Sequence, residues 1–250
     1  MFALVLLVFG LAALAFGTSS FFQMKRMALA PFRRTGEVAL RVDGPGVASA
    51  SGLVATEGKI SAPNAIRAPC SGHTCLYYEI TLDREWERPA EGGASGAKET
   101  GTTRVTTTRG GTIFQLDDGS GPVHVDTRDG AQAELAETHL ERFPIGQMVP
   151  GEIQFGQMRV QTPENLGSER TLSFTATERV LLAQGELYAC GKVTNGMLSK
   201  PAWADLVLSQ SGRDAQLVQA RRRAAASLLV GALLTAGSIP AFLLRPCPPR

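Results

Sequence analysis

The amino-acid sequence predicts a mainly β protein, in which a small barrel-like or sandwich domain lies between two transmembrane α-helices. Short alternating or β-branched runs recur from Gly36 to about Asp205, and Asp-Gly turn signals separate them. An uncharged apolar run of 21 residues lies near each end of the chain. Short strands with frequent turns favour an all-β domain over an α/β fold, and an OB-like barrel is one form of it.

The charge distribution divides the chain into an acidic middle and two basic ends. The 250 residues have a formal net charge of +2, but all 23 acidic residues lie between Glu37 and Asp214. That stretch contains 16 of the 25 Lys and Arg residues, so its net charge is −7, which argues against nucleic acid as a partner. A hydrophobic content of 44% excludes full disorder, and four cysteines exclude a disulfide scaffold.

The first apolar run, from Phe2 to Phe22, is long enough to cross a bilayer. At about 1.5 Å per residue, 21 helical residues reach roughly 31 Å, the thickness of a hydrocarbon core. We therefore predict a transmembrane helix at residues 1–23 and a basic juxtamembrane linker at 24–36. A cleaved signal peptide is the alternative; the length of the run and the lack of Lys or Arg before it argue against cleavage.

The second apolar run, from Ala224 to Leu244, predicts another transmembrane helix at 224–244. A basic segment at 209–223 precedes it and a short tail at 245–250 follows; a buried core helix is the alternative. Arginine supplies 20 of the 25 basic residues, which suggests a GC-rich bacterial genome.

The cations beside the two apolar runs lie mainly on the side of the middle domain. The positive-inside rule therefore predicts a two-pass protein of a bacterial inner (plasma) membrane, with the β domain cytoplasmic and both termini outside. The same cations are candidate contacts to lipid headgroups of the bilayer. They are Lys25, Arg26, Arg33, Arg34, Arg221, Arg222 and Arg223.

The middle domain, at 37–208, reads as strands separated by turns. The Gly-rich stretch Glu91 to Thr103 predicts a loop or a flexible hairpin end, and the Ala/Leu-rich stretch Ala131 to Leu140 predicts a short helix. The predicted strands are Val38 to Val42, Leu76 to Leu82, Arg104 to Thr108, Thr112 to Leu116, Pro122 to Asp126, Arg159 to Gln161, Thr171 to Val180 and Glu186 to Val193.

The clearest local unit is a β-hairpin from Ile113 to Asp126. One alternating strand enters the turn at Asp118 and Gly119, and a second alternating strand leaves it. The acidic residues of the turn do not have the spacing of a calcium-binding loop, so we interpret them as turn residues.

Three segments in this order resemble the GIDE-type, or BAM (beside-a-membrane), domain family. The first runs from Gly58 to Pro63 and on to Ala68–Ile80 and Trp86; the second is the hairpin; the third runs from Glu178 to Gly191. The family pattern Pro-x-Ser-Gly-x-x-Cys-x-Tyr-Tyr is kept at Pro69, Ser71, Gly72, Cys75, Tyr77 and Tyr78. The resemblance covers roughly Val38 to Leu244.

This family includes membrane-anchored E3 ubiquitin ligases of mitochondria and chloroplasts, which carry a RING after the second helix. A RING needs eight Cys and His ligands for two zinc ions. The chain has four Cys and three His in all, and only Arg245 to Arg250 follows the second apolar run. We therefore expect a RING-less relative in which ubiquitin-transferase activity does not carry over.

Cys70 and Cys75 frame a turn that contains Ser71 and His73. A metal or redox site is one reading, but the spacing is not C-x-x-C and no second pair follows, so we expect free thiols. Ser71 beside His73 suggests a nucleophile, but no G-x-S-x-G context supports it. We expect no catalytic residue, no metal ligand and no cofactor site in the chain.

Aromatic residues are the candidate partner-binding set. Tyr77 and Tyr78 point to opposite faces of one strand, so one is expected in the core and the other, with Trp86, on a partner surface; packing is the alternative role. Gly185, Tyr188 and Gly191 indicate a turn, a strand aromatic and a bulge or exit turn.

The function expected is that of a membrane protein whose membrane-proximal β domain binds or scaffolds another, unidentified protein. The first alternative is a ligase component that acts through a RING of a partner chain. The second is a binder of oligonucleotides, oligosaccharides or lipid headgroups, as short-strand barrels often are. Homo-oligomerisation has no support in the sequence.

Overall fold

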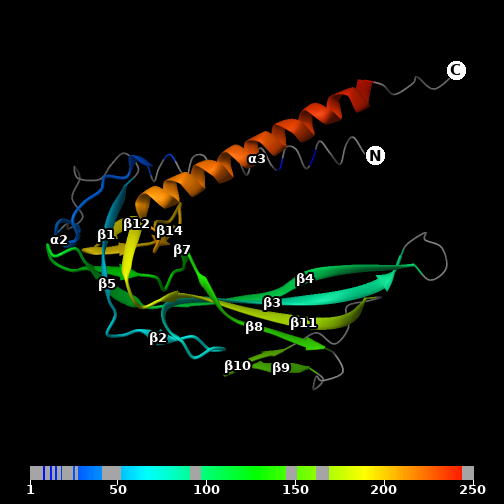
Figure 1. Ribbon diagram of the computed structural model, residues 1–250, viewed down its shortest axis with the longest axis horizontal. Helices are drawn as coiled ribbons and strands as arrows, with labels where there is room; N and C mark the ends of the chain where they lie inside the picture. Colours follow the sequence, from blue (N-terminus) through cyan, green and yellow to red (C-terminus); the bar gives the residue numbers. More distant parts are fainter. Residues whose placement is uncertain are drawn as a thin grey trace.

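The computed structural model shows a mainly β protein built from a barrel and a long sheet that projects from it (Figure 1). It describes residues 28–40, 52–90, 97–144, 151–161 and 169–243, together with positions 8, 12, 15, 18 and 25. The mainly β prediction is therefore confirmed.

Five strands close into a barrel, because the first strand pairs with both the second and the fourth. Four of the five contacts around the ring are antiparallel, and the contact between β6 and β13 is parallel. The ring runs β1-β5-β6-β13-β12 and back to β1. These strands are β1 (Leu53–Ser61), β5 (Ile113–Asp117), β6 (Val123–Asp126), β12 (Glu186–Thr194) and β13 (Met197–Ser199).

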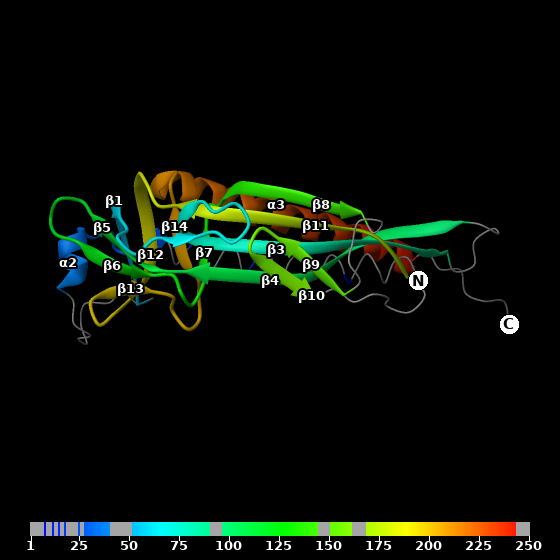
Figure 2. The ribbon, with the colours of Figure 1, turned by 90° about the horizontal axis from the view of Figure 1, so that it is seen from below.

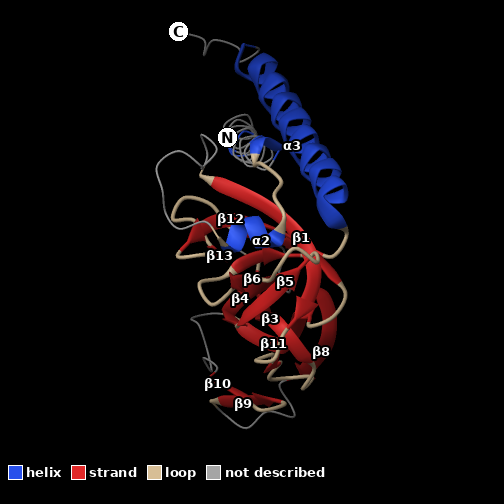
Figure 3. Ribbon diagram, turned by 90° about the vertical axis from the view of Figure 1, so that its left-hand side faces the viewer, coloured by secondary structure: helices blue, strands red, loops and turns tan. Residues whose placement is uncertain are grey.

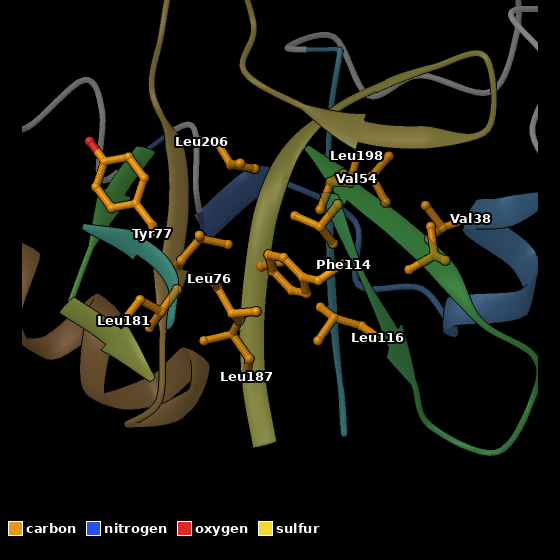
Figure 4. Packing of buried hydrophobic residues seen from close by; sticks show 14 residues of the cluster. Val38, Val54, Leu76, Tyr77, Phe114, Leu116, Leu181, Leu187, Leu198 and Leu206 are labelled. Atoms are coloured by element: carbon orange, nitrogen blue, oxygen red, sulfur yellow. The ribbon is translucent and has the colours of Figure 1, made fainter. Parts of the chain in front are cut away.

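Alternation along these strands fills the barrel with apolar side chains. Figure 4 shows Val54, Phe114, Leu116, Leu187 and Leu198 meeting in its interior, and each is at most 4% exposed. Every second residue of a strand faces the same side, so the inward set is apolar. The outward neighbours on β1 and β12, among them Ala55, Tyr188 and Cys190, are buried in a second cluster on the outer wall of the barrel. The predicted hairpin is confirmed as the antiparallel pair β5–β6.

A second sheet, here called the arm, extends away from the barrel. Its central strands β3 and β11 pair along most of their length; β4 pairs with β3 on one side and β8 with β11 on the other, in the order seen in Figure 2. The strands are β2 (Ile66–Arg67), β3 (Thr74–Pro89), β4 (Lys98–Gly111), β8 (Ala136–Pro144) and β11 (Arg170–Leu182).

One face of the arm is covered by a small hairpin, β9 (Glu152–Phe155) and β10 (Met158–Gln161). Phe155 is fully buried, and its ring meets that of Phe143 edge to face, with centroids 4.8 Å apart. The hairpin also binds the loop after β2, since the Gln157 amide donates to the Pro69 carbonyl at 3.0 Å. The opposite side of the arm is here called the open face.

The remaining elements attach around the barrel. The short strands β14 and β7 extend its sheet beyond β12, α2 packs beside β1 and β6, and α3 leaves from β12 and β14 and runs away from the barrel (Figure 3). Their bounds are β7 (Ala131–Ala133), β14 (Leu206–Ser209), α2 (Thr35–Ala39) and α3 (Gly212–Leu243).

Two local predictions are wrong, and a third is correct only in part. The described part of the predicted strand Val38 to Val42 belongs to α2, whose Val38 packs into the barrel core. The predicted helix Ala131 to Leu140 consists of β7 and the start of β8, because pairing with β14 and β11 outweighs local helix propensity. The stretch Glu91 to Thr103, predicted as a loop or a hairpin end, does follow β3 in the antiparallel pair β3–β4, but it is strand β4 from Lys98 onward, and residues 91–96 lie outside the described ones.

The predicted two-pass membrane localisation is also wrong. Among the residues that the structure describes, no helix combines the length and the apolar character that a membrane crossing needs. The helix α3 does cover the second predicted span, but it begins at Gly212 and includes Arg213, Asp214, Arg221 and Arg222. The first predicted span lies outside the described residues apart from a few isolated positions.

Close packing at Gly191 gives a direct test of the barrel. A Cβ atom there would lie 2.7 Å from both the Leu206 Cδ1 and the Ser199 carbonyl oxygen. Gly191→Ala should lower the free energy of unfolding by about 1–3 kcal/mol, the usual effect of overpacking. Urea denaturation measures it, with the exposed neighbour Lys192→Ala as the control; equal stability of the two variants would contradict the packing.

Candidate functional site

A buried carboxylate organises the loop that carries the family motif. Glu178 of β11 is fully buried and accepts hydrogen bonds from the backbone amides of Cys70 and Ser71, at 2.6 and 3.1 Å. The hydroxyls of Ser71 and of Thr138 on β8 also donate to it. One side chain therefore joins the motif loop, β11 and β8.

These bonds determine the charge state of the site. Burial raises the pKa of Glu178, but the hydrogen bonds from Ser71 and Cys70 outweigh it, and the net pKa lies below the ordinary value of 4.5. Glu178 is thus an ionised acceptor at neutral pH and not a poised general base. The Ser71 hydroxyl already donates its hydrogen bond to Glu178, so Ser71 is not available as a nucleophile.

The two cysteines of the motif are free thiols of low reactivity. Burial and the nearby Glu178 charge raise the pKa of Cys70 to about 12 and that of Cys75 to about 11. Because the thiolate is the reactive form, these values disfavour nucleophilic and redox roles. His73 is exposed, and within the described residues no group of three His, Cys, Asp or Glu side chains could hold a metal ion.

A second carboxylate fixes the hairpin turn to α2. Asp118 accepts hydrogen bonds from the Ser120 and Thr35 hydroxyls, at 2.5 and 2.7 Å, which hold its pKa well below the ordinary range. Gly119 beside it has φ +91°, a conformation that only glycine adopts without strain. Both residues thus shape the turn, and neither is arranged as a metal ligand.

The structure separates the three aromatic candidates. Tyr77 is 1% exposed and packs in the barrel core, whereas Tyr78 and Trp86 are half-buried on the covered side of the arm. Tyr78 and Trp86 stand directly opposite Gly110 and Gly101 of β4, and a Cβ atom on either glycine would lie 2.4 Å from the facing ring. Both rings thus cover glycines of the edge strand.

The third family segment forms the end of β11 and most of β12. Gly185, with φ +89°, lies in the turn between these strands, and its carbonyl accepts from the Ile60 amide at 3.0 Å. Tyr188 is 1% exposed and packs on the outer wall of the barrel. Gly72 has φ +72° and Pro69 precedes the clamped loop, so the motif residues shape the backbone.

The candidate headgroup cations are exposed wherever the structure describes their side chains. Lys25, Arg33, Arg34, Arg221 and Arg222 are exposed, while Arg26 and the side chain of Arg223 lie outside the described residues. Arg33 pairs with Glu37 at 3.9 Å, a surface contact of small energy.

The open face of the arm is a ladder of ion pairs. Carboxylates lie on the central strand β3, at most 34% exposed, and pair with side chains on the flanking strands that are each more than half exposed. Examples are Asp83 with Arg104 and Glu79 with Arg109, both at 2.7 Å. The face therefore presents cations outward, although the middle of the chain is acidic.

The edge strand β4 is the arm's longest free margin. Among the residues that the structure describes it pairs with β3 only, and most of its own residues are exposed. Sequence reasoning missed this edge because the Gly-rich stretch before Thr103 indicated a loop. It also missed the role of Glu178, although both Glu178 and its partner Ser71 stand within the segments that resemble the family.

These features define the class of protein. It is a mainly β protein in which a closed five-stranded barrel carries a long β arm, and a buried glutamate holds the loop that contains the family motif. The sequence matches the GIDE family, described as E3 Ubiquitin ligase, over residues 84–242. The chain belongs to the GIDE family. Neither the curated proteins nor the solved structures contain a significant match.

Removal of the Glu178 charge should destabilise the arm. In Glu178→Gln the four donors face an uncharged amide, whose oxygen is a weaker acceptor and whose NH2 group cannot accept. We therefore expect a loss of about 2–4 kcal/mol in the free energy of unfolding. The half-exposed Glu137→Gln, with its pair at 4.0 Å, is the control and should cost less than about 0.5 kcal/mol.

The lowered pKa of Glu178 predicts that the stability difference between the wild type and Glu178→Gln depends on pH. The folded-state pKa of Glu178 is lowered, so its contribution is complete above the ordinary value of 4.5 and is lost as the pH falls through the folded-state pKa. The stability difference between wild type and Glu178→Gln should therefore be constant from pH 7 to about pH 5 and shrink below it. A difference that grows on acidification would refute the assignment.

Proposed function

We propose that this chain is a non-catalytic protein-binding module that recognises an extended segment of a partner by strand addition to β4. The observation that carries the proposal is the edge of β4, whose 14 residues have a strand partner on one side only within the described part of the chain. An unpaired edge offers a row of N–H and C=O groups that another polypeptide strand matches.

A β-bulge divides this edge into two segments suited to short peptides. Six residues, Thr106 to Gly111, pair with Tyr77 to Leu82, and seven, Lys98 to Arg104, pair with Asp83 to Pro89, with the register shift between them. The exposed guanidinium of Arg104 lies on the open face beside the second segment. We therefore expect a strand with acidic residues at alternate positions, which would form cross-strand pairs with this face.

The barrel topology supports the arm as the recognition element. Numbered within the barrel, the ring order is 1-2-3-5-4, with strands 3 and 5 parallel, and we infer an OB-like barrel from it. OB-folds bind ligands partly through the loop between their first two strands. In this chain that connection contains β2, β3 and β4, so it forms one part of the arm; β8 and β11 come from the connection between the third and fourth barrel strands, β6 and β12.

The proposal includes the absence of catalysis in this chain. Two observations support it: the Ser71 hydroxyl is held by Glu178, and the raised pKa values of Cys70 and Cys75 keep both thiols in their unreactive form. The family description favours a second candidate function, a RING-less ligase relative that places a substrate beside a RING of another chain.

Peptide selection on the full chain tests strand addition. Selected peptides should be extended and acidic at alternate residues, and N-methylation of alternate backbone amides should abolish binding because it removes the ladder donors. Hydrogen exchange should slow in residues 98–111 and not in 136–144, the other edge of the sheet. Binding that survives N-methylation would refute the mode.

Charge reversal on each edge provides the matched protein variants. Arg104→Glu on β4 should weaken binding of the selected peptides about five- to tenfold. Arg142→Glu on β8 removes an equally exposed ion pair and should leave binding unchanged. Equal loss in both variants would place recognition outside the β4 edge.

A reconstituted ubiquitination assay tests the catalytic part. With activating enzyme, conjugating enzymes, ubiquitin and ATP, the chain alone should form no ubiquitin conjugates, because it provides fewer Cys and His residues than the eight ligands of a RING. Conjugates that form with this chain as the only ligase component would contradict the proposal.

A further inference from the structure

A cavity of about 550 Å³ lies where the open face of the arm meets the barrel. Tyr77 and Glu79 of β3, Arg109 of β4 and Arg179 of β11 line one side of it; residues 128–133, which include β7, line the other. A volume of this size is typical of small-molecule sites. Neither Glu178 nor Arg104, the residues used above, belongs to its wall.

The floor of the cavity contains a phenol whose proton has no acceptor. Tyr77 is 1% exposed; the Ala131 amide lies close enough to the phenol oxygen to affect its pKa, but no group within the described residues accepts the hydroxyl proton. Figure 4 shows this hydroxyl directed away from the apolar side chains of the barrel core. Burial raises the pKa of Tyr77 and outweighs the opposing effects of Arg109 and the Ala131 backbone, so the group is a neutral O–H donor. A buried hydroxyl without a partner is unfavourable unless something accepts its proton.

The guanidinium groups around the cavity have donors to spare. Arg109 and Arg179 stand directly opposite Glu79 on its two sides in the sheet. Arg109 uses only its Nε, on Glu79 at 2.7 Å, and Arg179 makes a single contact, to Glu137 at 4.0 Å, beyond hydrogen-bond length. Each guanidinium has five N–H donors, so most of them face the cavity or solvent without an acceptor from the described chain.

The free N–H donors indicate the sign of the ligand. Four basic side chains and three carboxylates line the cavity, but Arg128 is paired with Asp126 at 2.7 Å, so three cations and three carboxylates remain. Glu79 already accepts from Arg109, and Asp205 lies 3.3 Å from Lys200, which leaves Asp129 as the third carboxylate. Most N–H groups of Arg109 and Arg179 have no acceptor within the described residues, and they match the acceptor-only oxygens of an anion.

We propose that this cavity binds a small ligand through an oxyanion group, a phosphate or a carboxylate, held by Arg109 and Arg179 with the Tyr77 hydroxyl as a further donor. Planar guanidinium groups suit both oxyanions, because their N–H pairs match the spacing of the oxygens. Arg109 belongs to β4, but Tyr77, Arg179 and residues 128–133 do not, so variants at Tyr77 and Arg179 test oxyanion binding separately from strand addition.

Calorimetric titration of the full chain tests the site. The probes are inorganic phosphate, pyrophosphate and succinate, at about 50 mM salt, where charge–charge attraction is only moderately screened. The wild type should bind at least one probe with a Kd of about 1 mM or tighter. Binding of the phosphate probes alone assigns the site to phosphate ligands, and binding of succinate as well extends it to carboxylates.

Three variants decide whether the binding is specific to the cavity. Arg179→Gln should weaken it about tenfold, and Tyr77→Phe, which keeps the ring, by a smaller factor of about three to ten. Arg104→Gln, on the same face but outside the cavity, should bind as the wild type does. If Tyr77→Phe does not fold, Arg179→Gln alone tests whether the binding is specific to the cavity, because Arg179 is half-exposed and its replacement should not disturb folding. No binding of any probe up to about 20 mM, or equal loss in Arg179→Gln and Arg104→Gln, would overturn the proposal.

Discussion

The buried carboxylate of Glu178 accepts four hydrogen bonds, and the structure of the arm depends on them. It fixes the loop at Cys70 and Ser71 against β11 and, through Thr138, β8. That loop in turn receives the β9–β10 hairpin, where a Cβ atom on Gly156 would lie 2.6 Å from the Pro69 carbonyl oxygen. An ionised group with no solvent contact is tolerated only with such partners. The clamp, the hairpin and the covered face therefore form one cooperative unit, and the opposite face remains open.

The distribution of charge over the arm follows from its pairing. Carboxylates on the central strand β3 are flanked by strands on both sides, so each has cationic neighbours within reach and limited contact with water. The long side chains of Arg104 and Arg142 extend from the flanking strands and keep most of their exposure. A segment of net charge −7 thus presents a surface of guanidinium groups, a property that summing charges along the sequence cannot reveal.

What the sequence predicted well was local. The β5–β6 hairpin follows from alternation and an Asp-Gly turn, and its register needs no distant contact. The helix α2 and the strand β8 depend on distant partners, namely Asp118 for the Thr35 end of α2 and β11 for β8, so local propensity misassigned both. The family motif identified Ser71, but its pairing with Glu178, 107 positions away, required the fold. The membrane prediction is wrong on the finding that no helix among the described residues is both long and apolar enough to cross a bilayer.

Closure of the barrel restricts where a partner strand can add. A ring of five strands has no free edge, so unpaired strand backbone in this part of the molecule is found mainly at the margins of the arm. Of its two long margins, β8 has nine residues, ends at Pro144 and changes register opposite Glu178 and Arg179. Proline provides no amide donor, and a bulge turns the edge away from a regular ladder. The edge β4 has 14 residues, contains no proline, and keeps regular pairing over six and seven residues on either side of its single shift, so it is the better template for an added strand.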